Sequence, residues 1–227
     1  NSSLSLGANP FTIDFWAKYS AAPPQIALIG HDNGPGTQDK WVLWGGQGVE
    51  FHTNTIPAPG RVVSIPWVPD IGAWHHIAVT RSGFNFRIYV DGRQVASAVN
   101  DLVLPDPTAA LTIGQAEGGN FFNGALDEIR ISSVARSPQE FNLQLPPVSL
   151  VANATGTTVG LTWANGGGVV PLMRYRIYRG ADSSSIALID LTTNNSYSDA
   201  GLVAGTTYFY RISAVDSTGF EGARSYA

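Results

Sequence analysis

One stretch near the middle of the chain constrains the fold more than any other. In residues 74–80 and again in residues 86–90, apolar side chains alternate with polar ones, which is the period of a strand with one buried face. Asp91 and Gly92 follow at once, and this pair tolerates the positive φ angles of a type I′ turn. The sequence therefore predicts a strand and a tight hairpin that reverses at Asp91-Gly92.

Further short strands are expected throughout the first part of the chain. Turn signals rich in glycine and asparagine, such as residues 32–36 and 117–120, separate them. Many short antiparallel strands with no helix between them predict a sandwich or barrel. The expected strands are Phe11–Lys18, Gln25–Gly30, Lys40–Leu43, Val49–Thr53, Arg61–Ile65, Trp74–Thr80, Asn85–Val90, Gln94–Ser97, Leu111–Gly114 and Ala125–Ile131.

A domain boundary is expected at the adjacent prolines Pro146 and Pro147, which stiffen the chain and do not fit the interior of a sheet. Just before it, Ser137, Pro138 and Glu140 have the pattern of a helix N-terminus with a capping box. We therefore expect a first domain over residues 1–145, closed by one short helix, and a second over residues 146–227.

The second domain is predicted to be a smaller sandwich. Alternating apolar residues in 159–163, 175–177 and 208–214 indicate strands. With Trp163 on an early strand and Leu202 six residues before Tyr208, the region resembles a fibronectin type III domain. The resemblance implies a tyrosine corner, in which the Tyr208 hydroxyl hydrogen-bonds to backbone across the edge of the sandwich.

The first domain resembles the laminin-G-like, pentraxin-like jelly rolls of the concanavalin A-like lectin/glucanase superfamily. The resemblance is carried by residues 74–95 and supported by residues 11–16, 111–114 and 123–131. It implies a jelly-roll sandwich over residues 1–145. The expected fold class is thus all-β, a concanavalin A-like jelly roll followed by a smaller fibronectin type III, immunoglobulin-like sandwich.

Composition disfavours several classes of function. The net charge of −4, from 13 basic and 17 acidic side chains, disfavours a nucleic-acid partner. The absence of cysteine rules out disulfides and thiolate chemistry, and with modules of extracellular type it suggests a bacterial or phage surface protein. No apolar stretch approaches the ~20 residues of a membrane span. We expect a fragment of a larger secreted or cell-surface protein whose signal lies outside this sequence.

The residues for catalysis are not found. Retaining glycosidases need two carboxyl groups about 5–5.5 Å apart on one face. Asp127 and Glu128 are neighbours on an expected strand, so they are predicted to point to opposite faces. The same holds for His75, expected to face outward, and His76, expected to be half-buried. We therefore expect no enzymatic activity.

Calcium is the cofactor for which the sequence offers candidate ligands. Residues 38–44, beginning Gln38-Asp39-Lys40, and the loop of residues 114–117 resemble the two calcium-binding segments of pentraxins. The resemblance implies Asp39 and Glu117 as metal ligands, because Ca²⁺ prefers hard oxygen atoms on flexible loops. Lys40, however, replaces a residue of ligand type. A single ion near Asp127 is the alternative, and ordinary solvated acidic residues are the third reading.

Ligand contacts are expected on the loops of residues 31–40, 65–70 and 115–123, where a rigid sandwich displays recognition residues. Trp67 lies in a proline-fixed loop and is the tryptophan expected to be exposed. It is either a platform for a sugar face or a plug that closes the end of the sandwich, and the plug is the more common role of such a loop tryptophan. Trp41, His31 and Asn33 complete the candidate ligand-binding set. Trp41 and Trp44 are three residues apart and are expected on opposite faces of one strand, at least one of them buried.

The favoured function is a non-catalytic binding region of a larger extracellular, bacterial protein, carbohydrate-binding or adhesive. Its partners would be a glycan or a cell-surface or matrix polysaccharide, besides other domains of the same protein. The alternatives are structural spacer or display modules with no small-molecule ligand, and an accessory region of a secreted enzyme. The choice of ligand rests on analogy between folds.

Overall fold

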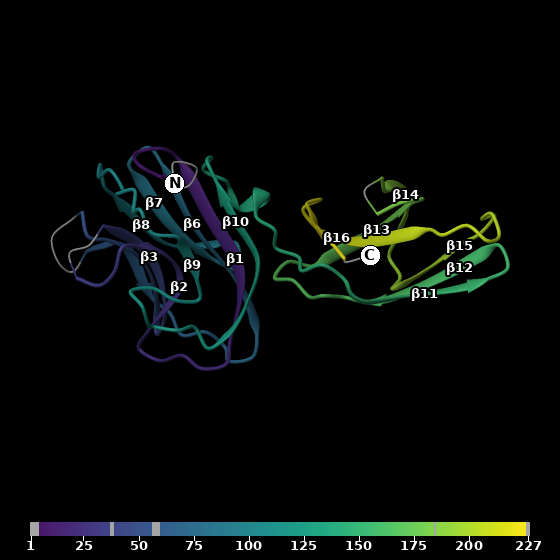
Figure 1. Cartoon of the computed structure of the whole chain (residues 1–227), viewed down its shortest axis with the longest axis horizontal. Coiled ribbons are helices and arrows are strands. Elements are labelled where there is room, and N and C mark those ends of the chain that lie inside the picture. The colour runs from purple at the N-terminus through teal and green to yellow at the C-terminus, as the bar shows by residue number, and fades with distance from the viewer. Residues whose placement is uncertain (1–4, 37–38, 56–59, 184, 226–227) are drawn as a thin grey trace. The chain divides into compact units, whose positions relative to one another are not determined.

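The computed structural model describes residues 5–36, 39–55, 60–183 and 185–225. The chain divides into two compact units, Asn1–Phe141 and Asn142–Ala227 (Figure 1). Both are built from strands, and the predicted short helix is present as the 3₁₀ helix η2 (Pro138–Glu140). Within the described ranges, no helix has the length and apolarity needed to cross a membrane.

The first unit contains two five-stranded sheets whose strand orders are β10-β1-β6-β7-β8 and β5-β4-β3-β2-β9. This arrangement confirms the predicted sandwich, and each of the ten predicted strands is present with ends shifted by up to three residues. The strands are β1 (Phe11–Tyr19), β2 (Gln25–Asp32), β3 (Lys40–Gly46), β4 (Gly48–Thr53), β5 (Arg61–Pro66), β6 (Trp74–Ser82), β7 (Asn85–Val90), β8 (Arg93–Val99), β9 (Leu111–Ile113) and β10 (Gly124–Ser132).

The hairpin predicted at Asp91-Gly92 joins β7 to β8. Val90 pairs with Arg93, so two residues make the loop. Asp91 has φ 51° and Gly92 has φ 75°, the positive angles that a type I′ turn requires at both central positions.

Aromatic packing between the two sheets forms the core of this unit. Phe11 of β1, Phe51 of β4 and Phe86 of β7 have no exposed surface. The ring centroid of Phe51 lies 5.6 Å from that of Phe11 and 6.1 Å from that of Phe86. Because strand side chains alternate, burial of Phe51 turns its neighbours Glu50 and His52 to the outer face of the sheet.

The outer face of the other sheet carries a buried ionic cluster. Arg130 of β10 holds Asp14 of β1 with two hydrogen bonds, of 2.9 Å to Oδ1 and 2.6 Å to Oδ2. His76 Nε2 lies 3.4 Å from Asp14 Oδ2. Burial by itself would raise the pKa of Asp14, but the hydrogen bonds from His76 and Arg130 outweigh it and lower the pKa.

Low pH should therefore lower the free energy of unfolding of the first unit, because it protonates Asp14. Its carboxylate contributes stability above the unfolded-state pKa of about 3.9, and this contribution is lost as pH falls through the lowered folded-state pKa. Replacing Asp14 by Asn should cost about 3–5 kcal/mol at pH 7, since it leaves Arg130 without its partner. Urea unfolding across the acid range should show the two proteins converging at low pH.

The exposed Asp101 gives the control for this prediction, because D101N should leave the free energy of unfolding nearly unchanged. If the wild type and D14N differed by the same free energy of unfolding at every pH, the charge of Asp14 would have no part in the stability.

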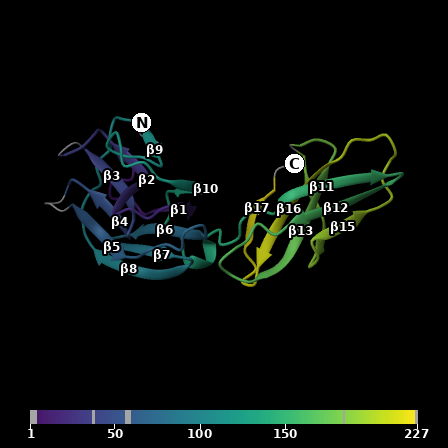
Figure 2. The same cartoon turned by 90° about the horizontal axis from the view of Figure 1, so that it is seen from below.

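The second unit is a sandwich of a three-stranded sheet, β11-β12-β15, and a four-stranded sheet, β14-β13-β16-β17 (Figure 2). This is the architecture of a fibronectin type III domain, as the sequence predicts. The backbone N–H of Val203 donates a 3.3 Å hydrogen bond to Tyr208 Oη, which confirms the tyrosine corner. The strands are β11 (Val148–Thr155), β12 (Thr158–Ala164), β13 (Leu172–Gly180), β14 (Ala187–Thr192), β15 (Ser196–Asp199), β16 (Phe209–Asp216) and β17 (Glu221–Arg224).

Residues 143–145, which precede the two prolines, are hydrogen-bonded within the second unit. Val169 N donates to Leu143 O at 3.1 Å, and Leu145 N donates to Gly167 O at 2.9 Å. The side-chain amide of Gln144 donates to the carbonyl of Val170. These bonds tie the segment to the loop between β12 and β13.

We predict that residues 142–227 fold alone and that removing residues 142–145 destabilises them. Three lost hydrogen bonds should lower the free energy of unfolding by ~2–3 kcal/mol. Chemical unfolding of the two segments measures the difference. W163A is the positive control, since a large-to-small change in the core should cost about 3–5 kcal/mol. A non-cooperative transition of residues 142–227 would contradict the prediction.

Candidate functional site

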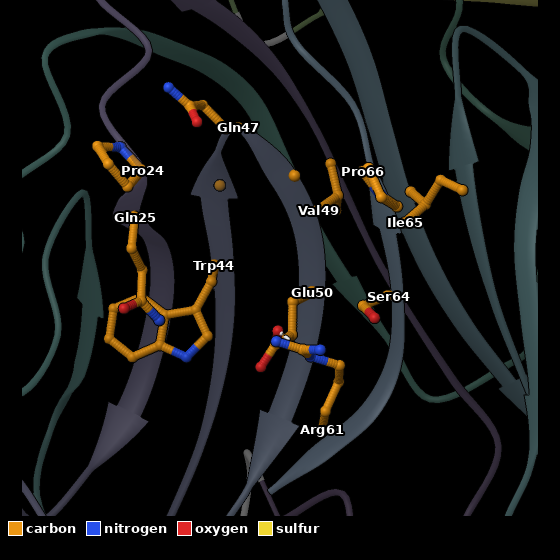
Figure 3. A pocket seen from close by; sticks show the side chains of 12 residues that line it. Pro24, Gln25, Trp44, Gln47, Val49, Glu50, Arg61, Ser64, Ile65 and Pro66 are labelled. Atoms are coloured by element: carbon orange, nitrogen blue, oxygen red, sulfur yellow. Dashed lines mark hydrogen bonds and ion pairs between the residues drawn. The ribbon is translucent and has the colours of Figure 1, made fainter. Parts of the chain in front are cut away.

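A groove of about 400 Å³ lies on the outer face of the sheet β5-β4-β3-β2 (Figure 3). Its sides come from the strands and from the turn between β3 and β4. The lining residues are Pro24, Gln25, Trp44, Gly45, Gln47, Gly48, Val49, Glu50, Arg61, Ser64, Ile65 and Pro66.

Strand register sets the floor of the groove. Trp44 of β3 pairs with Glu50 of β4, and Glu50 pairs with Ser64 of β5, so these three side chains form a row across the sheet. His52 pairs with Arg61 in an adjacent row. Residues that pair across neighbouring strands share a face of the sheet. The residues between these two rows point the other way, into the core, so both rows lie on the outer face.

The charges in the groove are paired with one another. Arg61 Nε lies 2.5 Å from Glu50 Oε2, and His52 Nδ1 lies 3.2 Å from Glu50 Oε1. Partial burial by itself would raise the pKa of Glu50, but the hydrogen bonds from His52 and Arg61 outweigh it and lower the pKa. The Arg61 side chain is 53% exposed, so its guanidinium remains open to solvent.

Trp44 lines the groove, but most of its ring is covered. The residue is 5% exposed, and its indole Nε1 is buried and has no hydrogen-bond partner among the described residues. Gln25 and Trp44 line the groove from the paired strands β2 and β3, and in Figure 3 Gln47 lies at the opposite end of the groove from Arg61. The amide, carboxylate and guanidinium groups around this largely buried indole suit a ligand with many hydroxyl groups.

Three of the predicted ligand-binding residues lie together, and two of them, His31 and Trp41, are buried. His31 is 1% exposed, and its Nε2 lies 3.0 Å from Ala109 O. Trp41 has no exposed surface and packs against Phe51 in the core, so its ring offers no face to a ligand. Asn33 is exposed and accepts a 3.0 Å hydrogen bond from Ala109 N.

Trp67, expected to be the exposed tryptophan, is instead half-buried and packs against the core. Its ring makes edge contacts with Tyr19 and His75, at centroid distances of 6.0 and 5.1 Å.

The expectation that His75 faces outward is wrong. This residue is 9% exposed because Trp67 packs on its ring and Asp91 Oδ2 lies 3.0 Å from its Nδ1. His76, expected to be half-buried, is 1% exposed.

The candidate metal ligands do not form one site. Lys40 is ion-paired with Glu117, and its side chain is 4% exposed. Asp39 is exposed, and Gln38 lies outside the described residues. In the described part of the chain, no group of three or more His, Cys, Asp or Glu side chains is placed to hold a metal ion. An ammonium group on a candidate ligand does not fit Ca²⁺.

Asp127 lies elsewhere, on β10, where it is exposed and accepts a 2.8 Å hydrogen bond from Glu128 N. The register of β1 and β10 shifts here, so that Asp14 pairs with Arg130 and Trp16 with Asp127. Glu128 has φ 51°. This β-bulge interrupts the strict alternation assumed from the sequence.

We predict that calcium leaves the stability of the protein unchanged. An ion that bound only the folded loops would raise the melting temperature by mass action, and Lys40 opposes such binding. Thermal unfolding in excess Ca²⁺ and in excess chelator should give superimposable curves. A higher melting temperature in Ca²⁺ would contradict the prediction and restore Asp39 and Glu117 as ligands.

Comparison with known families identifies the first unit. The profile described as the concanavalin A-like lectin/glucanases superfamily matches residues 1–142. The chain belongs to this superfamily. The solved structure of CBM40 from the Ruminococcus gnavus IT-sialidase shares the fold, with a TM-score of 0.51 and 15% identity over 60% of this chain and 82% of that chain.

Two curated relatives show sequence similarity over parts of the chain. Neuronal pentraxin-1 of Rattus norvegicus is 32% identical over 151 residues, which cover 59% of this chain and 33% of the pentraxin. Poly(3-hydroxybutyrate) depolymerase of Delftia acidovorans is 33% identical over 90 residues, which cover 40% of this chain and 17% of the depolymerase. The matched regions thus span a minor part of both relatives.

Sequence reasoning missed most of the groove. Gln25, Gln47, Glu50, Arg61 and Ser64 are not among the predicted site residues. Trp44 was considered as one of two strand tryptophans, and Ile65 and Pro66 belong to the predicted ligand loop of residues 65–70. The alternation of residues 49–53 contained a signal, because it places Glu50 and His52 on the face opposite Phe51.

Proposed function

We propose that the first unit is a non-catalytic carbohydrate-binding domain and that an uncharged polysaccharide binds in the groove at Trp44, Glu50 and Arg61. The observation that carries the proposal is the pairing of Arg61 and His52 with Glu50 beside the indole of Trp44. The carboxylate can accept hydrogen bonds from hydroxyl groups, and the guanidinium and amide groups can donate to them. Because the charges balance, the groove favours a neutral glycan.

The membership of the chain in a superfamily of lectins and glucanases supports the same proposal. Among the described residues that line the groove, Glu50 is the one carboxylate, whereas glycoside hydrolysis by the usual mechanism needs two. The short span of the match to the depolymerase, an enzyme named for a polymer, supports an accessory region of a larger secreted enzyme.

Affinity electrophoresis against a panel of neutral plant and microbial polysaccharides tests the proposal. At least one polymer should retard the wild type. E50Q and R61Q should each weaken that binding by roughly tenfold, because each removes a hydrogen-bonding group that is charged. R93Q is the matched control, since Arg93 is an exposed residue of β8 outside the groove.

No retardation by any member of the panel would overturn the proposal and favour the spacer function. Binding that is lost in W67A but kept in E50Q and R61Q would move the site to the loop of residues 65–70, in agreement with the prediction from sequence.

A further inference from the structure

The arginines of the second unit gather on one face of one sheet. Arg176 of β13 pairs with Ser213 of β16, which pairs with Arg224 of β17, so both arginines share a face. Arg174 and Arg211 stand two residues from Arg176 and Ser213 on the same strands and therefore project to the same side. We name these four residues, Arg174, Arg176, Arg211 and Arg224, the arginine face.

The inward positions of these strands confirm that the arginine face is the outer one. Tyr175, Ile177 and Ile212 are buried in the core of the second unit. The alternate residues on β13 and β16 must therefore point away from the core.

The positive charge of the arginine face is only partly neutralised. Glu221 is ion-paired with Arg176, and it also accepts hydrogen bonds from the hydroxyl groups of Tyr178 and Ser213. Within the described ranges, Arg174, Arg211 and Arg224 have no ion pair. One carboxylate against four guanidinium groups leaves a net charge of about three, although the whole chain has a net charge of −4.

Packing orders part of the arginine face in advance. The Arg224 guanidinium lies over the ring of Tyr178 at 3.7 Å from its centroid, and the Tyr178 hydroxyl is held by Glu221. Tyr178 is 4% exposed. A guanidinium stacked on an aromatic ring loses less conformational freedom when it binds, and its planar fork matches a carboxylate or a sulfate.

We infer that the arginine face binds an acidic polysaccharide through its carboxylate or sulfate groups. Strand geometry places Arg176 and Arg224 two strands apart, at about 10 Å, so one extended polymer can contact several arginines. A nucleic acid fits less well. The Tyr178 ring is covered by Arg224 and cannot stack on bases, and the negative net charge opposes a dense phosphate backbone.

The inference is independent of the groove and can be tested separately on the chain of 227 residues. Polygalacturonate and dextran sulfate are the acidic polymers, and methyl-esterified polygalacturonate and dextran are their neutral counterparts. At least one acidic polymer should retard the wild type, and its neutral counterpart should not. Retardation should decrease when added salt shortens the Debye length from ~30 Å to ~8 Å, because salt screens the attraction between the arginines and the acidic polymer.

The double variant R174Q/R211Q should weaken the acidic binding by roughly tenfold, because it removes two charges that have no internal partner. R87Q/R93Q is the matched control, since it changes the net charge equally on strands β7 and β8 of the first unit and should bind like the wild type. A thermal melt of each variant should show that the fold is retained.

Three results would overturn the inference. They are no retardation by either acidic polymer at low salt, equal binding by R174Q/R211Q and the wild type, and tighter binding of duplex DNA that R174Q/R211Q abolishes. One result would support the inference while contradicting the proposed function. In it, R61Q binds the acidic polymers as tightly as the wild type does, and no neutral polymer retards the protein.

Discussion

The structure of the first unit depends on aromatic rings that fill the space between two sheets. Phe11, Phe51 and Phe86 come from three strands of both sheets and have no exposed surface. A slip of one residue in β4 would expose Phe51 and bury Glu50, which would cost both apolar burial and the desolvation of a carboxylate. The core therefore determines which side chains reach the groove, so recognition chemistry can vary on the outer face while the inner face is kept.

The sequence was sufficient to predict local features with a distinct chemical cause. The hairpin at Asp91-Gly92 needs positive φ angles, and Leu202 and Tyr208 have the spacing of a tyrosine corner. The groove joins Trp44, Glu50 and Ser64 through strand pairing, and no motif in the sequence encodes that register. His75 was placed wrongly for a different reason. It pairs with the buried Ala17 and shares the inner face of its strand with Ile77, so the alternation of the strand already pointed inward.

The burial of Arg81 is another feature that the sequence does not predict. As the penultimate residue of β6 it has the sequence of an ordinary strand end, yet it is 1% exposed and donates to the carbonyl oxygens of Gly7, Gly83 and Leu102. Burial lowers the pKa of Arg81. Three carbonyl acceptors satisfy the guanidinium in place of a carboxylate, and they tie two distant segments to β6, which only the tertiary structure reveals.

Charge is arranged differently on the two proposed surfaces, and the difference has a physical consequence. In the groove Glu50 and Arg61 neutralise each other, so binding there should depend little on salt, whereas the unpaired Arg174 and Arg211 act through a field that salt screens. Two such sites on one chain make the second contact with a mixed polymer intramolecular, with an effective concentration set by the connection between the units. Weak binding at each site would then suffice for retention on a surface that carries both neutral and acidic chains.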